Sequence, residues 1–238
     1  MLRRVAAVAR SQARELSRRR LALAMLILLP LVFYWITRSD DYAPVFASVG
    51  IGWAFSVATL FLTQGMHQVS PRLSLLNFRS GEILAGRVLC ALTFGALVAA
   101  GLWLYIRRDP VIVNETELIW AFAFALLGSV TLGLAVGALV QREMEAMLLL
   151  VGIIGIQFVV DPGTTFAKVL PLYAAERQAA VAAGWGWPLQ SLRWTAAVSA
   201  VLFTVAVVAS TVRAPRPINR SSSTSSGTGS ASGTSDIT

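Results

Sequence analysis

Long apolar runs separated by short polar or charged segments dominate the pattern of this chain. Six runs stand out, at about 21–37, 46–66, 86–106, 118–140, 146–160 and 191–212. Each run is bounded by charged residues, proline or glycine, and is continuously apolar rather than alternating. Because backbone polar groups inside a bilayer must find partners within their own segment, such runs predict spanning helices rather than barrel strands. We therefore expect an all-α, polytopic membrane protein with a six-span domain over residues 21–212.

The composition supports the same class. Of the 238 residues, 56% are hydrophobic and 13% are charged, whereas about one-quarter of the residues in soluble domains are charged. Each span needs about 20 apolar residues, so roughly six spans fit and leave only short connections and tails. These values exclude a soluble globular domain.

The first 20 residues predict a helix that lies on the membrane surface. Apolar residues recur at helical spacing, and basic residues fall on the opposite side. Such a helix places its apolar stripe in the inner interface and its basic face against anionic headgroups. The alternative is a plain targeting flank, which requires the charges but not the stripe. The stripe comprises Leu2, Val5, Ala9, Ala13 and Leu16, and the basic side comprises Arg3, Arg10, Arg14 and Arg18.

The net charge of +8 is explained by membrane orientation, and we expect no nucleic-acid partner. With the N-terminal end inside, 14 of the 20 basic residues fall in inner segments, in keeping with the positive-inside tendency. Both ends are therefore expected in the cytoplasm of a cell, bacterial by the Arg-rich composition, with the spans in its plasma membrane. Residues 213–238 are rich in serine, threonine and glycine and predict a disordered cytoplasmic tail.

Catalytic, metal-binding and nucleotide-binding motifs are missing from the sequence. His67 is the one histidine and Cys90 the one cysteine, so neither an HExxH motif nor a cysteine pair is available. The chain also has no GxxxxGK[ST] loop to cradle phosphates. We expect no catalytic residue, no metal and no resident cofactor. If ATP drives this protein, another chain binds the ATP and magnesium.

Small and hydroxyl residues form stripes within three of the runs. In the second run, Ser48, Gly52, Ser56, Thr59 and Thr63 follow one helix face, which either permits close packing or lines a polar path. Similar stripes, Ala91–Gly95–Ala99 and Ser129–Gly133–Gly137, predict packing faces. The aromatic residues within the spans are explained equally well by a cargo path and by core packing. Candidate pathway residues are Tyr34, Ser56, Thr59, Thr63 and Gln157.

The stretch 67–86, between the second and third runs, carries exposed apolar and basic residues. Ser70-Pro71 is a helix-start signal, and a short surface helix of this composition suits docking into a partner. The alternative is an ordinary loop. The residues assigned to this coupling helix and its flank are Pro71, Arg72, Leu75, Leu76, Phe78, Arg79 and Glu82.

Taken in order over residues 1–212, these elements resemble the permease subunit of ATP-binding cassette (ABC) type 2 exporters. The most specific piece is 79–87, RSGEILAGR, which is similar to the family's Glu-Ile-x-x-Gly-Lys stretch before the third span. The close of the fourth run, LGLAVGAL at 132–139, is a second piece. In the outer segment 161–190, the residues LPLY at 170–173 and WGW at 185–187 resemble the re-entrant hairpin that caps the exit in this family.

The resemblance implies a half-transporter that pairs with a second permease, either a copy or a paralogue, and with two ABC ATPase subunits. The coupling helix would seat in an ATPase groove, and Pro171 and Tyr173 would belong to the outer gate. The implied cargo is hydrophobic or amphiphilic, such as a drug, an antibiotic, a lipid or a glycolipid. Two alternatives stay open: a non-transporting immunity, assembly or regulatory protein, and, less favoured, a membrane-embedded lipid enzyme.

Overall fold

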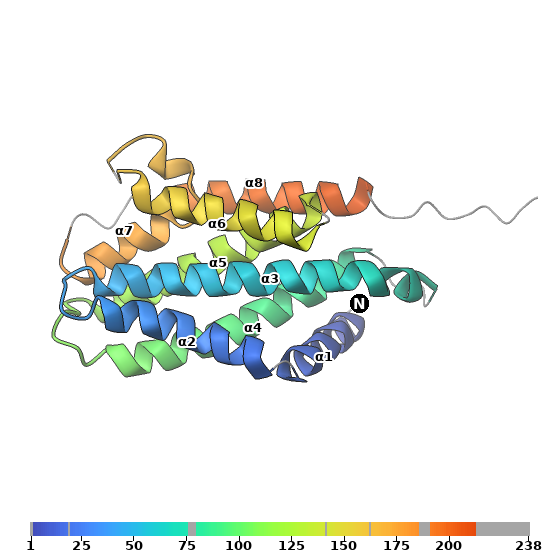
Figure 1. The fold of residues 1–238 in the computed structure, drawn as a ribbon, viewed down its shortest axis with the longest axis horizontal. Coiled ribbons are helices and arrows are strands. Elements are labelled where there is room, and N and C mark those ends of the chain that lie inside the picture. Colours follow the sequence, from blue (N-terminus) through green and yellow to red (C-terminus); the bar gives the residue numbers. More distant parts are fainter. Residues whose placement is uncertain are drawn as a thin grey trace, which may run out of the picture.

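The computed structural model describes residues 2–18, 20–75, 80–140, 142–161, 163–185 and 191–212, which form an elongated helical bundle (Figure 1). These residues contain no strand, so the prediction of an all-helical protein is confirmed. The predicted disordered tail, 213–238, lies outside them. The elements are α1 (Leu2–Arg18), α2 (Arg20–Ile36), α3 (Ala43–Leu75), α4 (Ser80–Ile106), α5 (Glu115–Leu139), α6 (Glu143–Val159), the 3₁₀ turn η1 (Ala167–Val169), α7 (Tyr173–Ala182) and α8 (Ser191–Val212).

Three helices are long and apolar enough to cross a membrane: Ala43–Gly65 of α3, Gly81–Ile106 of α4 and Glu115–Leu139, which is α5. Two shorter apolar stretches, Leu23–Ile36 and Ala196–Ala209, belong to α2 and α8. The six apolar runs of the sequence coincide with α2 to α6 and α8. The chain is therefore a helical protein with three helices suited to crossing a membrane, and the count of six spans stays a prediction.

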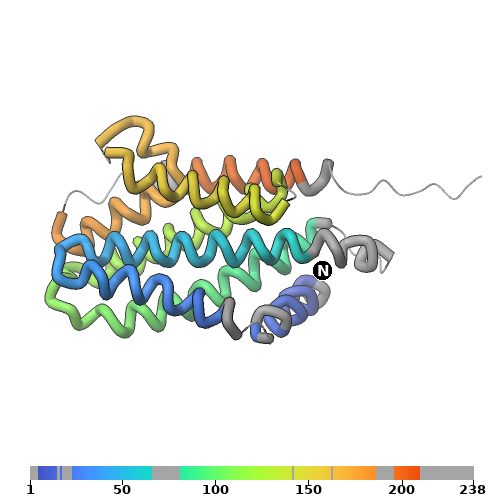
Figure 2. The backbone as a smooth tube through the Cα atoms, in the orientation of Figure 1, coloured from blue at the N-terminus to red at the C-terminus, as the bar shows by residue number. Residues whose placement is uncertain are grey.

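The helices define two ends of the bundle. The end of α3, the start of α4 and the end of α8 point toward the same end of the bundle as α1, and we call this the α1 end (Figure 1). The α2–α3 and α4–α5 connections and α7 lie at the opposite end, the α7 end, as the tube in Figure 2 also shows. A change at one end can therefore affect the other end only through the helices between them.

The coupling helix was expected to be separate from the second span, and the structure differs. α3 runs without interruption from Ala43 to Leu75. Residues 66–70 contain no glycine or proline, so nothing in that stretch ends the helix where the apolar run ends. Pro71, Arg72 and Leu75 consequently belong to the last part of α3, although their side chains lie outside the described part. Leu76, Phe78 and Arg79 lie outside the described residues altogether.

Glycines let α3 and α5 approach closely. A Cβ atom at Gly133 would lie 2.4 Å from the Ser56 backbone oxygen, and one at Gly137 would lie 2.8 Å from the Thr63 Cβ. Ser56, Thr59 and Thr63 are buried at this contact. The two threonine hydroxyls donate hydrogen bonds to carbonyls one turn earlier in α3, at 2.7 and 2.8 Å. The predicted packing face on α5 is confirmed.

Two further helix–helix contacts also depend on a glycine at the point of close approach. A Cβ at Gly95 of α4 would lie 2.4 Å from Leu126 of α5, which confirms the packing face on the third run. A Cβ at Gly50 of α3 would lie 2.8 Å from the Cα of Pro30, the proline inside α2. In each pair a glycine on one helix admits a bulkier residue of its neighbour.

α1 packs against the beginning of α4. Val8 is 5% exposed and fills the space beside Gly86, where a Cβ would lie 2.7 Å from a Val8 methyl carbon. Arg10 and Arg14 are exposed, whereas the side chains of Arg3 and Arg18 lie outside the described part. Val8 and Gln12 are the buried side chains of α1 among those described, while Val5, Ala9 and Ala13 of the predicted stripe are half-buried. The contact of the stripe with the membrane stays a prediction.

The glycine contact between α3 and α5 generates a prediction about stability. Gly133→Leu forces a side chain against the α3 backbone, and we expect a loss of about 1–3 kcal/mol, typical of overpacking. Gly155→Leu in α6 is the matched control, because a Cβ there has nothing within 4 Å. Thermal unfolding of the purified variants in detergent measures both, and equal midpoints would contradict the proposed packing.

Candidate functional site

After α6 the chain turns back into the bundle. The turn at Pro171–Leu172, here called the inward turn, lies between α3 and α5. Leu172 is fully buried; a Cβ at Gly52 would lie 2.5 Å from its methyl carbon, and one at Gly128 would lie 2.4 Å from the Pro171 oxygen. At 1.5 Å per residue, these glycines lie about 14 and 20 Å from the starts of α3 and α5. The inward turn therefore reaches deep between two candidate spans.

α7 leads from the inward turn back to the outer edge of the α7 end, which we call the rim. There it is held by hydrogen bonds. The N–H groups of Val113 and Asn114 donate to the Ala182 oxygen at 2.9 and 3.1 Å. The Gln178 amide donates to the carboxylate of Glu117 in the first turn of α5. The rim end of α7 is thus joined to the α4–α5 connection through polar contacts.

Gly184 ends α7 and turns the chain. Its φ of +89° lies in the left-handed region, which glycine enters without the steric cost of a Cβ. Gly184 donates to the Val181 oxygen at 3.0 Å and Trp185 to the Ala180 oxygen at 2.8 Å. This pair of bonds is a Schellman ending, which satisfies the last carbonyls of the helix.

A polar pair, Glu176 of α7 and Gln157 of α6, lies beneath the rim. Gln157 is 4% exposed, and neither of its amide atoms has a hydrogen-bond partner of good geometry among the described residues. Burial raises the pKa of Glu176 from its ordinary value of 4.5 to about 8, and the nearby Gln157 only partly offsets this effect. Glu176 is therefore largely protonated at neutral pH, although its surface is only half-buried.

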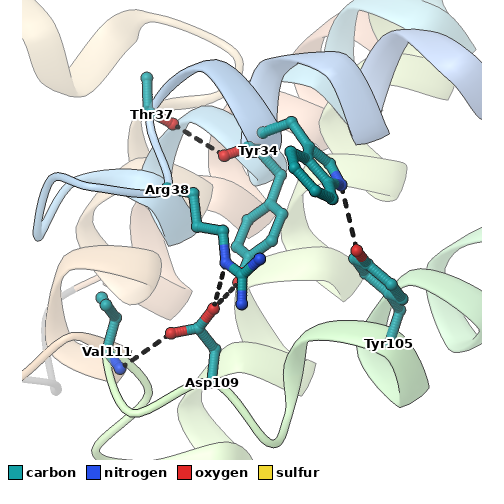
Figure 3. A network of polar contacts seen from close by, with 7 residues as sticks. Tyr34, Thr37, Arg38, Tyr105, Asp109 and Val111 are labelled. Atoms are coloured by element: carbon teal, nitrogen blue, oxygen red, sulfur yellow. Dashed lines mark hydrogen bonds and ion pairs between the residues drawn. The ribbon is translucent and has the colours of Figure 1, made fainter.

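A second polar network joins α2 to the α4–α5 connection (Figure 3). The Tyr34 hydroxyl donates to Asp109 Oδ2 at 2.5 Å and Arg38 Nε donates to the same oxygen at 3.1 Å, while the Val111 N–H donates to Oδ1 at 3.3 Å. Burial would raise the pKa of Asp109, but the bonds from Tyr34, Val111 and Arg38 outweigh it and lower that pKa. The carboxylate consequently stays charged and fastens the ends of α2 and α4 together. Beside it, Trp35 Nε1 donates to the Tyr105 hydroxyl at 3.1 Å.

The structure separates the predicted pathway residues instead of gathering them. Ser56, Thr59 and Thr63 lie in the α3–α5 contact, and Tyr34 lies in the Asp109 network. Gln157 alone of this set faces α7, the helix that begins at the predicted gate residues Pro171 and Tyr173. The candidate site is therefore the inward turn with α7 and the Gln157–Glu176 pair, which we call the α7 site.

Glu82, the described member of the predicted coupling set, lies at the α1 end. It is 5% exposed in the first turn of α4, one helical turn before Gly86, which contacts α1. Glu82, in the first turn of α4, and the α7 site thus lie toward opposite ends of the bundle (Figure 1).

Two groups of the α7 end were missed by the sequence analysis. Asp109 directly follows the Arg107-Arg108 pair after the end of α4, and an acid beside a basic pair at the end of a span is the available signal for its structural role. Glu176 lies in an alanine-rich stretch, YAAERQAAVA, next to Arg177 and Gln178, and alanines on both sides of this polar group are the available signal for close packing. Neither signal identifies the partner residue.

The described residues hold no group of three histidine, cysteine, aspartate or glutamate side chains arranged for a metal ion. Neither a scan of known protein-family models nor a search for similar characterised proteins finds a match for this chain.

The Asp109 network leads to a prediction about the α7 end. Tyr34→Phe removes a hydrogen bond to a charged group, for which we expect a loss of about 1.5–3 kcal/mol. Tyr42→Phe is the control, since Tyr42 is 52% exposed and contacts Trp185 through its ring, at 5.4 Å between centroids. Thermal unfolding midpoints measure the difference, and an equal effect of the two changes would refute the role of the network.

The Glu176 carboxyl leads to a prediction about pH. A raised folded-state pKa means that the folded chain binds more protons than the unfolded chain between about pH 4.5 and pH 8, so stability falls as pH rises through that window. We expect the unfolding midpoint to drop by at least about 2–4 °C, the effect of 1 kcal/mol in a chain of this size.

Glu176→Gln keeps the shape and removes the titration, so its unfolding curve should lack this drop and lie above that of the parent at pH 9. Parallel pH dependence in the two proteins would contradict the burial of an acid at the α7 site.

Proposed function

We propose that this chain is the membrane subunit of an ATP-driven exporter of the ABC type 2 class, with ATP hydrolysed by a separate subunit. The observation that carries the proposal is the inward turn, which fills the space between α3 and α5 from the α7 end while α1 packs on α4 at the opposite end. A gate at one end and a force-receiving surface at the other are what an exporter driven by a cytoplasmic motor requires.

In this proposal the α1 end faces the cytoplasm. The exposed Arg10 and Arg14 of α1 are suited to the anionic inner surface, as expected for an interfacial helix. Residues 71–79, followed by Glu82, receive the ATPase subunit. Movement of the first turn of α4 is passed to α1 through the Val8–Gly86 contact and to α5 through the Gly95–Leu126 contact. These contacts connect the proposed coupling surface to the helices that hold the inward turn.

The α7 site is the proposed outer gate. Pro171 and Leu172 close the space between α3 and α5 by apolar contact, and Glu176 opposite Gln157 adds a neutral polar pair beneath the rim. An apolar closure with few polar groups suits a hydrophobic or amphiphilic cargo. The complete exporter would contain a second permease, either a copy or a paralogue, and two ATPase subunits, with ATP and magnesium held by the latter.

The experiment uses the tagged chain in membranes of its own host, where its natural partners are present. We expect a protein with a phosphate-cradling loop to co-purify, together with ATP hydrolysis that the isolated chain lacks. The double change Leu76→Ser and Phe78→Ser removes two large apolar groups, each worth about 1.5–3 kcal/mol when buried. It should therefore reduce the co-purified ATPase by at least about tenfold, and Glu82→Ala should reduce it less.

Phe166→Ser is the matched control, because Phe166 is 58% exposed in the connection before α7 and belongs to the opposite end. Abundance in the membrane is measured for every variant. Failure to recover any ATPase with the unaltered chain would overturn the proposal in favour of a non-transporting membrane protein. Equal recovery with the double variant would remove the coupling role from residues 76–78.

A further inference from the structure

An apolar groove runs between α2 and α4 on the outside of the bundle. It has a volume of about 560 Å³, and its walls include Ile27 and Pro30 of α2 and Leu97, Gly101 and Tyr105 of α4. Gly101 leaves open space inside the groove, since a Cβ there would have nothing within 4 Å. Ile27 and Leu97 on its rims are 55% and 66% exposed, so the groove is open toward the surroundings of the bundle.

One end of the groove is polar. Tyr105 forms that end, and its hydroxyl accepts the hydrogen bond from Trp35. The two side chains are 50% and 54% exposed, and exposed tyrosine and tryptophan at the end of a span are typical of the headgroup level. The groove mouth therefore lies at a membrane interface, and the apolar part extends inward from it.

An arginine side chain lies beside this mouth. The Arg38 guanidinium lies 5.5 Å from the centroid of the Trp35 ring. Within the described residues Arg38 forms its hydrogen bond and ion pair through Nε alone, to Asp109, and its side chain is 52% exposed. Its terminal nitrogens are thus available to an anion, and guanidinium groups bind phosphate through such paired donors.

The length of the groove matches one leaflet of a bilayer. From Phe94 to Tyr105, the lining residues of α4 cover 11 steps of 1.5 Å, about 16 Å, and half of a 30 Å hydrocarbon core is about 15 Å. We propose that the groove binds one acyl chain of a phospholipid, with the phosphate of that lipid at Arg38. This site is separate from the α7 site and does not depend on the proposed transport function.

The competing occupant is a helix of a second copy of this chain. Most homo-oligomers are symmetric about a twofold axis, and two copies in one membrane share the same orientation. A twofold contact through this groove would therefore bring the exposed Arg38 side chains of both copies toward each other, which is unfavourable for like charges. A phospholipid instead supplies the opposite charge at the same height.

The test uses the full-length chain in phosphatidylcholine vesicles that contain a minor fraction of phosphatidylglycerol with a photoactivatable diazirine on one acyl chain. After illumination, mass spectrometry maps the labelled peptides. We expect labelling to concentrate on residues 23–31 and 94–105. Gly101→Phe fills the groove and should lower that labelling several-fold, whereas Gly152→Phe should leave it unchanged, since Gly152 of α6 also has nothing within 4 Å of its Cβ position.

Three results would overturn the inference. Labelling spread evenly over all exposed apolar helices would mean that the lipids only surround the protein. Labelling of the groove that Gly101→Phe does not reduce would place the lipid elsewhere on α2 and α4. Cross-linking of Leu97→Cys between two copies, with no lipid adduct, would assign the groove to a second copy.

A diacylglycerol with the same photoactivatable chain tests the headgroup. Weaker labelling by this phosphate-free lipid supports the assignment of the phosphate to Arg38, and equal labelling refutes it.

Discussion

The close approach of α3 and α5 is the constraint on which the rest of the structure depends. Between helices inside a bilayer no water is expelled, so association relies on van der Waals contact and on backbones that can come near each other. Gly133 and Gly137 provide that closeness in one half of the contact. In the other half, at Gly52 and Gly128, the same two helices leave a space that the inward turn fills. One helix pair therefore both holds the bundle together and shapes its candidate site.

The sequence predicts the helices well because they depend on local properties. Continuous apolar runs placed α2 to α6 and α8, and glycines at helical spacing located the packing faces on α4 and α5. The separate coupling helix was wrong for a local reason too, since no residue in 66–70 ends α3. The contact of Val8 with Gly86 was not predicted, because Gly86 lies far from α1 in the sequence.

The polar contacts of the α7 end could not be predicted from the local sequence. Tyr34 and Asp109 are separated by 75 positions, and the sequence of neither segment indicates that the other is its partner. Gln157 was recognised as a polar residue within a span, but its neighbour Glu176 was not, because α7 comes to lie beside α6 only after the chain has turned back into the bundle. A single sequence indicates which residues need partners, and tertiary packing decides which ones they obtain.

The two ends of α7 are held by different kinds of interaction. Hydrogen bonds join its rim end to Val113, Asn114 and Glu117, whereas its inner end is held mainly by packing, with Leu172 seated between two glycines and Glu176 beside Gln157. A helix that is held by hydrogen bonds at one end and mainly by packing at the other can pivot about its hydrogen-bonded end. Since ten helical residues measure about 15 Å, a tilt of about 20° at the rim displaces the tip by about 5 Å, one helical turn. In the proposed exporter, a slight spreading of α3 and α5 would allow such a tilt, and the tilt would withdraw Leu172 from its seat.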